Sequence, residues 1–364
     1  MRFFDRFFQG HAVNGGHAHR CLARRRTFAL NRGALHHAND FPKSLPILLI
    51  KTLRRHATHF PKQTVWRPIH NGGFAPRPPS FSIPSIQLYF HPMRSLSNPA
   101  GNDNALLCAE DPPAVTLRNS QGTGPGVILC DHASNAVPKS LNFLGLPPAT
   151  LKRHIAYDIG AQGMAEVISD RLDMPAVIAG YSRLVIDLNR PADDFTSVRE
   201  IYDGAVIPGN RRLSAHALQA RIDDLFHPYH DTIQQAIVQK SKSQPHPAII
   251  SVHSCTDVYL DQKRPWHIGV LSNRDRRMAE RVLLRLAAHR PDLTIGDNKP
   301  YSGLNPYGFT VETHALPQGR PNVLFEVRQD IIASPAGQRE FGELIATVLD
   351  EVLGDPSLFT RYPS

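Results

Sequence analysis

The sequence predicts an α/β domain with a mainly parallel or mixed central sheet and helices on both of its faces. From residue 126 onward, short apolar runs alternate with longer segments in which apolar residues recur at helical spacing. This alternation is typical of sheets whose parallel strands are joined by helices. The same stretch contains no internal repeat and no low-complexity tract. Residues 126–355 are therefore expected to form one domain, followed by a short tail at 356–364.

Six apolar runs are interpreted as strands, at 127–130, 176–179, 184–188, 248–252, 268–271 and 322–327. Short continuous apolar runs that end at loop-forming residues are typical of buried strands.

Four segments carry apolar residues at helical spacing, at 161–172, 214–238, 278–286 and 334–349. Ser214 is a suitable N-cap for the second segment, and Pro228 predicts a kink within it. Pro335 suits the first position of the last helix, because that position needs no N–H donor.

The positive charge of the chain is confined to its N-terminal quarter. Residues 1–92 contain 14 Lys and Arg against 2 Asp and Glu, whereas the other 272 residues contain 27 against 30. The basic segment also has no sustained helical or alternating period, so no packed core is expected there. It could be a nucleic-acid-binding arm, a mitochondrial-type presequence, or a non-native extension translated upstream of a true start at Met93. Residues 93–125 are interpreted as a leader into the first strand.

The four cysteines have no metal-binding spacing, and two of them, Cys130 and Cys255, adjoin predicted strand ends. Cys130 and Cys255 are expected to be reduced packing residues of a cytoplasmic protein. No apolar run approaches the roughly 20 residues of a membrane span.

Two histidines stand at the ends of predicted strands, His132 after 127–130 and His253 after 248–252. Ligands of open α/β sheets gather at the carboxyl ends of strands. A catalytic zinc uses three protein ligands and leaves a fourth position open. The candidates for the third ligand are Asp158, at the start of a helix, and Asn135.

Glu326 is an acid within an otherwise apolar strand, where an ionised carboxylate is costly unless it is paired or functional. It is a candidate general base. Asn189 and Arg190 suit a substrate carboxylate, since guanidinium binds carboxylate in a bidentate fork, and Arg183 could hold a second one. Each of these residues also has a purely structural interpretation, as a turn residue, a helix-terminal acid or an ion pair.

The ordered motifs resemble those of the N-formylglutamate amidohydrolase family over about residues 126–352. They are His132-Ala-Ser-Asn, Tyr157-Asp-Ile-Gly, the long run from Tyr181 to Pro191, Pro228-Tyr-His-Asp-Thr and Val252-His-Ser.

The resemblance implies the zinc carboxypeptidase-like (phosphorylase/hydrolase-like) α/β superfamily. By this resemblance, His132 and His253 are metal ligands, Glu326 is the general base, and Asn189 with Arg190 binds the substrate carboxylate. His314 matches a further position near the substrate. Asn135 stands where the superfamily has a ligand Glu, so Asp158 is predicted as the third ligand.

The expected activity is hydrolysis of a small N-acylated acidic amino acid by one bound Zn²⁺. The resemblance implies conversion of N-formyl-L-glutamate to formate and glutamate in histidine breakdown. Alternatives are a peptidase or deacylase for other carboxylate substrates, and a non-enzymatic carboxylate-binding protein. The expected partner is a small molecule that carries a carboxylate. No membrane or nucleic-acid partner is expected, unless the basic arm binds nucleic acid.

Overall fold

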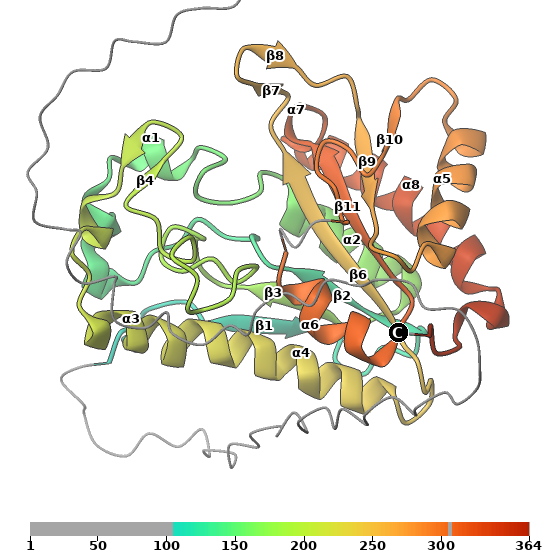
Figure 1. Cartoon of the computed structure of the whole chain (residues 1–364), viewed down its shortest axis with the longest axis horizontal. Coiled ribbons are helices and arrows are strands. Elements are labelled where there is room, and N and C mark those ends of the chain that lie inside the picture. Colours follow the sequence, from blue (N-terminus) through green and yellow to red (C-terminus); the bar gives the residue numbers. More distant parts are fainter. Residues whose placement is uncertain (1–104, 305–307, 364) are drawn as a thin grey trace, which may run out of the picture. The chain divides into compact units, whose positions relative to one another are not determined.

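A computed structural model describes residues 105–304 and 308–363. Its main feature is a central sheet of seven strands (Figure 1). In spatial order the strands are β1 (Val115–Arg118), β3 (Ala176–Ala179), β2 (Gly126–Cys130), β6 (Ala248–Cys255), β11 (Asn322–Arg328), β9 (Ile268–Leu271) and β10 (Ile295–Asp297). β1 is antiparallel to β3, and β9 is antiparallel to β11, whereas the other neighbours are parallel. The predicted mixed α/β sheet is confirmed.

Helices cover both faces of the sheet because its central strands are apolar on both sides. Ile128 and Cys130 of β2 pack in one core with α2 (Ala161–Leu172), α5 (Arg277–His289) and α8 (Pro335–Leu353). Val127 and Leu129 alternate with them and face a second core, which includes Tyr229 and Ile233 of α4 (His227–Lys240). Continuous apolar runs of this kind are typical of strands that are buried on both faces.

The segment 184–188, predicted as a strand, is an irregular turn-rich loop. Its apolar side chains are buried, which explains the strand-like sequence. The carbonyls of Leu184 and Val185 are bound by side chains and not by a neighbouring strand. Asn210 Nδ2 donates to Leu184 O at 2.9 Å, and Arg221 Nη1 donates to Val185 O at 2.7 Å. This loop leads directly to the predicted Asn189–Arg190 pair.

The predicted helix 214–238 is divided into three parts. α3 (Ala215–Arg221) is followed by a π-helical turn (Ile222–Phe226) and then by α4. Ser214 Oγ accepts from Ala217 N at 3.1 Å, which confirms the predicted cap. Ser334 caps α8 in the same way, through Gly337 N.

The remaining elements are short. The helices are α1 (Pro148–Leu151), α6 (Thr310–His314) and α7 (Gln329–Ile332). Two small hairpins are β4 (Ile201–Tyr202) with β5 (Ala205–Val206), and β7 (Val258–Tyr259) with β8 (Gln262–Lys263). The β7–β8 hairpin follows β6 and projects beyond the sheet (Figure 1).

The interpretations of the basic segment, the boundary at 92/93 and Cys21 concern positions outside the described residues. Of the cysteines that the structure describes, Cys108, Cys130 and Cys255 are free thiols. In the described part of the chain, no helix is long and apolar enough to cross a membrane.

Arg221→Met is expected to lower the free energy of unfolding by about 3 kcal/mol, because buried acceptors lose their donor. Arg221 is fully buried and also binds Asn210 Oδ1 and Gly209 O. Denaturant titration measures the change. Arg171→Met, which removes an exposed pair with Glu343, is the control and should change stability by about 1 kcal/mol or less. Equal stability of the two variants would contradict a structural role for Arg221.

Candidate metal centre

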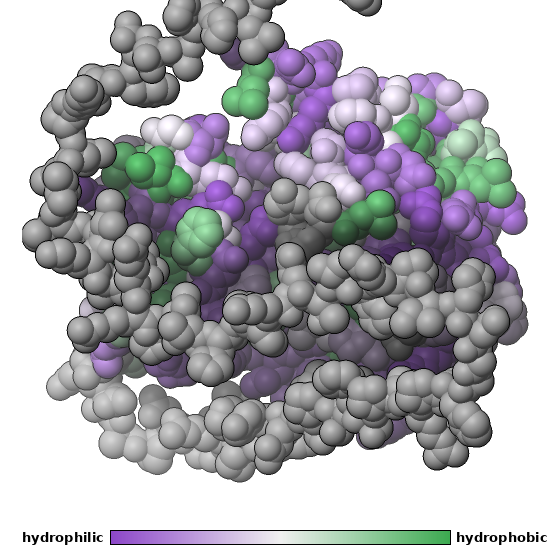
Figure 2. Space-filling view, viewed as in Figure 1, coloured by the Kyte–Doolittle hydropathy of each residue, from purple (hydrophilic) through white to green (hydrophobic). Residues whose placement is uncertain are grey.

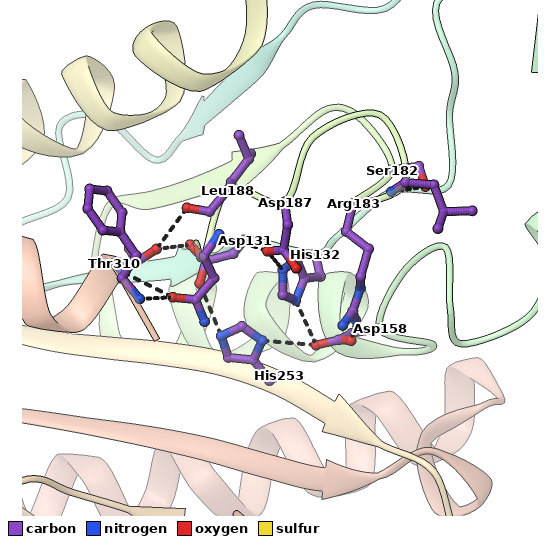
Figure 3. A network of polar contacts seen from close by, with 12 residues as sticks. Asp131, His132, Asp158, Ser182, Arg183, Asp187, Leu188, His253 and Thr310 are labelled. Atoms are coloured by element: carbon purple, nitrogen blue, oxygen red, sulfur yellow. Dashed lines mark hydrogen bonds and ion pairs between the residues drawn. The ribbon is translucent and has the colours of Figure 1, made fainter. Parts of the chain in front are cut away.

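Three buried ligand-type side chains from separate parts of the chain meet at the carboxyl edge of the sheet (Figure 3). His132 follows β2, His253 lies in β6, and Asp158 lies in the loop before α2. Their ligand atoms all lie within 4.8 Å of one another. The backbone fixes this meeting, because Asp158 N donates to His132 O at 2.8 Å and Ser254 N donates to Asp158 Oδ2 at 3.2 Å.

The Asp158 carboxylate lies between the two imidazoles. Its Oδ2 is 2.9 Å from His253 Nδ1 and 3.6 Å from His132 Nδ1. Asn135, the other candidate for third ligand, instead donates its amide to Leu151 O at 2.9 Å. The structure therefore places Asp158, and not Asn135, with the two histidines.

Each histidine contacts a second carboxylate through its other ring nitrogen. His132 Nε2 is 2.8 Å from Asp187 Oδ1, and His253 Nε2 is 3.1 Å from Asp131 Oδ2. Metal-binding histidines commonly donate their second N–H to a carboxylate, which orients the ring. The two Nδ1 atoms then remain for a metal beside Asp158. His132 Nδ1 is buried without a hydrogen-bond partner, so the donor set fits a divalent cation.

The pKa values of the two histidines are shifted in opposite directions. Burial, followed by the charge of Arg183, lowers the pKa of His132 to about 4, so this imidazole is neutral at pH 7. Burial opposes the charge of His253, but the hydrogen bond to Asp131 and the charges of Asp131 and Glu326 together raise the pKa of His253. A metal ligand must be a neutral imidazole, so a proton competes with a metal at His253 more than at His132.

Arg183, predicted to bind a second substrate carboxylate, is instead paired with Asp158. Its Nη2 contacts Asp158 Oδ1, and its side chain is 9% exposed. The backbone explains this position. Ser182 Oγ and Arg183 N both donate to Ala156 O, at 2.7 and 3.2 Å, which holds Arg183 beside the Asp158 loop.

Glu326 lies next to the triad. It is the register partner of His253 in the neighbouring parallel strand, so both side chains leave the same face of the sheet. Glu326 is buried, and its Oε2 has no hydrogen-bond partner. Burial raises its pKa, although the charges of His253 and Arg183 oppose the shift. A buried carboxyl with a raised pKa is suited to proton transfer.

Asn189 and Arg190 follow Asp187, whose carboxylate contacts His132. Asn189 Oδ1 accepts from Phe309 N at 2.7 Å and Thr310 N at 3.0 Å, at the start of α6. The side-chain carbonyl oxygen of Asn189 is therefore occupied by hydrogen bonds within the protein. Burial opposes ionisation of Asp187, but the contact with His132 and the charges of Arg183 and Arg190 keep its pKa below the usual range.

His314, predicted to lie near the substrate, is buried against a second histidine. Its Nε2 is 2.9 Å from His230 Nδ1, and His230 Nε2 is 3.0 Å from Leu188 O. A carbonyl only accepts, so His230 Nε2 is the donor, and His314 Nε2 donates to His230 Nδ1. Burial, followed by the charge of His230, lowers the pKa of His314 to about 3. In this structure His314 supports the 187–190 loop.

Sequence reasoning missed the residues that hold the ligands in place. Asp131 Oδ1 accepts from Tyr229 OH at 2.7 Å and Thr310 Oγ1 at 2.9 Å, while its Oδ2 faces His253. The available signal was an acid directly before His132 at a strand end. The motif at Pro228 contains Tyr229 but assigned it no role, and nothing in the sequence pointed to Thr310, because the contacts of both residues join distant segments.

Comparisons with known proteins agree with this fold. The family model described as N-formylglutamate amidohydrolase matches residues 124–333. A solved gene product, Atu2144 from Agrobacterium tumefaciens, is similar at 30% identity and a TM-score of 0.64, over 68% of this chain and 98% of that chain. N-formylglutamate amidohydrolase from Ralstonia eutropha JMP134 is similar in fold, at 17% identity and a TM-score of 0.53, over 66% and 98% of the two chains. Among curated proteins none matches.

Asp187→Asn is expected to lower zinc affinity about 10- to 100-fold, because the ring of His132 loses its charged acceptor. Competition with a chromophoric chelator measures the affinity. Asp170→Asn, at an exposed carboxylate paired with Arg118, is the matched control and should leave it unchanged. Equal affinities for the two variants would show that Asp187 does not orient a ligand.

Proposed function

Because the chain belongs to the N-formylglutamate amidohydrolase family, a family of amide-hydrolysing enzymes, we propose that it is a metal-dependent amidase for a small N-acylated acidic amino acid. N-formyl-L-glutamate is the reference substrate. The observation that carries the proposal is the buried His132–Asp158–His253 triad, in which a carboxylate backs each histidine.

Zn²⁺ suits this donor set, since catalytic zinc sites combine imidazole nitrogens with a carboxylate and keep one position open. His132, Asp158 and His253 would hold the ion. When bound, the ion would polarise the amide carbonyl and lower the pKa of water towards about 7. Asp158 would take the third ligand position that Asn135 does not fill, which weakens the alternative of a non-enzymatic relative.

Glu326 is the proposed proton carrier. It would take a proton from the attacking water and deliver it to the amide nitrogen as the C–N bond breaks. The new C–O bond forms at the carbonyl carbon, and the products are a carboxylate and a free amine. Support comes from its burial, its raised pKa and its position beside His253.

Arg190 is the proposed partner of the substrate carboxylate. It stands in the loop that begins at Asp187, and this loop is tied to the triad through His132. Arg183, placed on Asp158, would offset the charge of the tetrahedral oxyanion and would not bind a second carboxylate. A role of the protein in histidine breakdown, its cytoplasmic location and the absence of nucleic-acid and membrane partners stay predictions.

Chelation is expected to abolish formate release from N-formyl-L-glutamate by the full-length protein, and added Zn²⁺ should restore it, because the triad would hold the ion that polarises the amide. His132→Ala should lose both the bound metal and the activity. The control is His216→Ala, which changes an exposed histidine. Full activity in the chelated enzyme would refute the metal model. A parallel panel of N-acetyl and dipeptide substrates separates this amidase from the peptidase and deacylase alternatives.

Glu326→Gln is expected to lower kcat by about 10²- to 10⁴-fold, since the amide cannot carry the proton. Metal content should stay at the wild-type level, because Glu326 is outside the triad. Glu340→Gln, at a side chain that is 58% exposed, is the control. If the Glu326 variant retained wild-type kcat, another group would have to transfer the proton.

A further inference from the structure

Arg264 is a buried arginine at the base of the β7–β8 hairpin, next to the end of β6. It directly follows β8 and is only 7% exposed. Its backbone N donates to Asp257 O at 2.8 Å, which fixes it beside the first residues after β6. The hairpin projects from the molecule, and Figure 2 shows hydrophobic surface on it, whereas Arg264 lies at its base. A positive charge therefore stands at the end of the strand that carries His253.

Within residues 105–304 and 308–363, the guanidinium of Arg264 has only neutral partners. Nη1 donates to Thr256 O and to Thr256 Oγ1, both at 3.1 Å, and Nη2 donates to Tyr301 OH at 3.0 Å. A guanidinium carries five N–H groups, so these three bonds leave part of its donor capacity unused.

Two other arginines with similarly buried side chains pair with acids. Arg183 contacts Asp158, and Arg328 Nε lies 2.7 Å from Asp330 Oδ1. A buried charge is costly unless an opposite charge accompanies it. Arg264 is therefore suited to an anion that a ligand brings to it.

The guanidinium is held in one position before any ligand binds. Its carbon lies 5.1 Å from the ring centroid of Tyr259 and 5.0 Å from that of Tyr301, and aromatic rings attract a cation in this way. The Arg264 carbonyl also accepts from Arg328 Nη1 at 3.1 Å. A group that is already ordered loses little conformational freedom on binding, so it can recognise an anion at low entropic cost.

Arg264 lies one step along β6 from the triad. His253 and Cys255 are two residues apart in this strand, so their side chains leave the same face about 6.6 Å apart. Burial, followed by the charge of Glu326, raises the pKa of the Cys255 thiol to about 12, and the charge and hydrogen bond of Arg264 oppose this shift. The thiol next to His253 is therefore bonded to the guanidinium and lies near the Glu326 carboxylate.

Tyr301 supplies a second donor beside the guanidinium. Its oxygen accepts from Arg264 Nη2, so its own O–H remains available to donate. Burial, followed by the charge of Glu326, raises the pKa of Tyr301 to about 12, so the phenol is protonated at pH 7. A Cβ atom at Gly269, the register partner of Glu326, would lie 2.0 Å from Lys299 O and 3.3 Å from Glu326 Cβ. The chain that leads to Tyr301 thus passes directly beside Glu326.

We propose that Arg264, with Tyr301, binds the side-chain carboxylate of the substrate, so that the enzyme selects N-acylated acidic amino acids over their neutral analogues. This inference rests on the proposed amidase function and names the residue that sets its substrate choice. The α-carboxylate belongs to Arg190, whose loop contacts His132 on the β2 side of the triad. Arg264 thereby takes the role that the sequence predicted for Arg183.

The lengths involved allow this arrangement. In an extended glutamate, the amide nitrogen and the side-chain carboxylate carbon are about 5 Å apart. A charge-assisted hydrogen bond adds about 2.8 Å. Together they exceed the spacing of about 6.6 Å between successive same-face side chains of β6. A substrate whose amide lies at the triad can therefore reach the guanidinium beside Cys255 with its side chain.

The test compares kcat/KM of the full-length zinc-loaded enzyme for N-formyl-L-glutamate and for N-formyl-L-glutamine, which differs only in the charge of its side chain. We expect the glutamate substrate to be favoured about 100-fold, because only a carboxylate forms a charged pair with Arg264. Arg264→Gln should bring this ratio to about 1, and Arg264→Lys should keep a preference of about 10-fold, since lysine retains the charge without the planar fork. The ratio is measured on one sample, so it does not depend on how much of a variant folds. Arg285→Gln, at a side chain of α5 that is 54% exposed, is the control and should keep the wild-type ratio.

A wild-type ratio in Arg264→Gln would overturn the role of Arg264 while the amidase function stands. A variant that keeps this ratio but loses activity on N-succinylglycine relative to N-formylglycine would also overturn it, because the arginine would then bind a carboxylate of the acyl group. If the wild-type enzyme cleaves none of these substrates, the amidase proposal fails. Calorimetric binding of L-glutamate and L-glutamine then decides Arg264 separately. Loss of the preference for glutamate in Arg264→Gln supports the assignment, and an unchanged preference, or none in the wild type, overturns it.

Discussion

The carboxylate of Asp158 is the interaction on which the site depends. It contacts His132, His253 and Arg183, and it accepts from the backbone of Ser254. These contacts join the end of β2, the strand β6 and the 183–190 loop around one buried anion. An ionised carboxylate in such a position is stable only when opposite charge and donors surround it. The same donors make it a ready metal ligand, because the two Nδ1 atoms and the carboxylate face each other.

Around this carboxylate, a layer of polar contacts ties distant segments to the two histidines. Asp131 connects His253 to Tyr229 of α4 and to Thr310 of α6. Asn189 binds the first amides of α6, and the His314–His230 pair binds the carbonyl of Leu188. The loop of Arg190 is therefore held at Asn189 by α6, at Leu188 by His230 and at Asp187 by His132. A loop held in this way can present a charged group in a constant position, which is what substrate orientation requires.

The sheet also gives the site an axis. His132, His253 and Glu326 come from three adjacent strands, or from the residue just beyond one, and β9 and β10 continue the series.

The sequence by itself determined the α/β class, the helix cap at Ser214, the start of the last helix at Pro335 and five of the six predicted strands, because these depend on local periodicity and on single residue types. It also identified His132, His253 and Glu326 as unusual, since polar residues at or in apolar strands require a reason.

The tertiary structure decided which residues meet. Leu184 to Leu188 have the composition of a strand, yet they form a loop in which Asn210 and Arg221 bind the carbonyls of Leu184 and Val185. Arg183 proved to pair with Asp158, and His314 with His230. Asp158 and Asn135 were both candidates for the third ligand, and only the location of their side chains relative to the two histidines distinguishes them. Such pairings depend on distances between segments far apart in the chain, and local sequence carries no direct record of those distances.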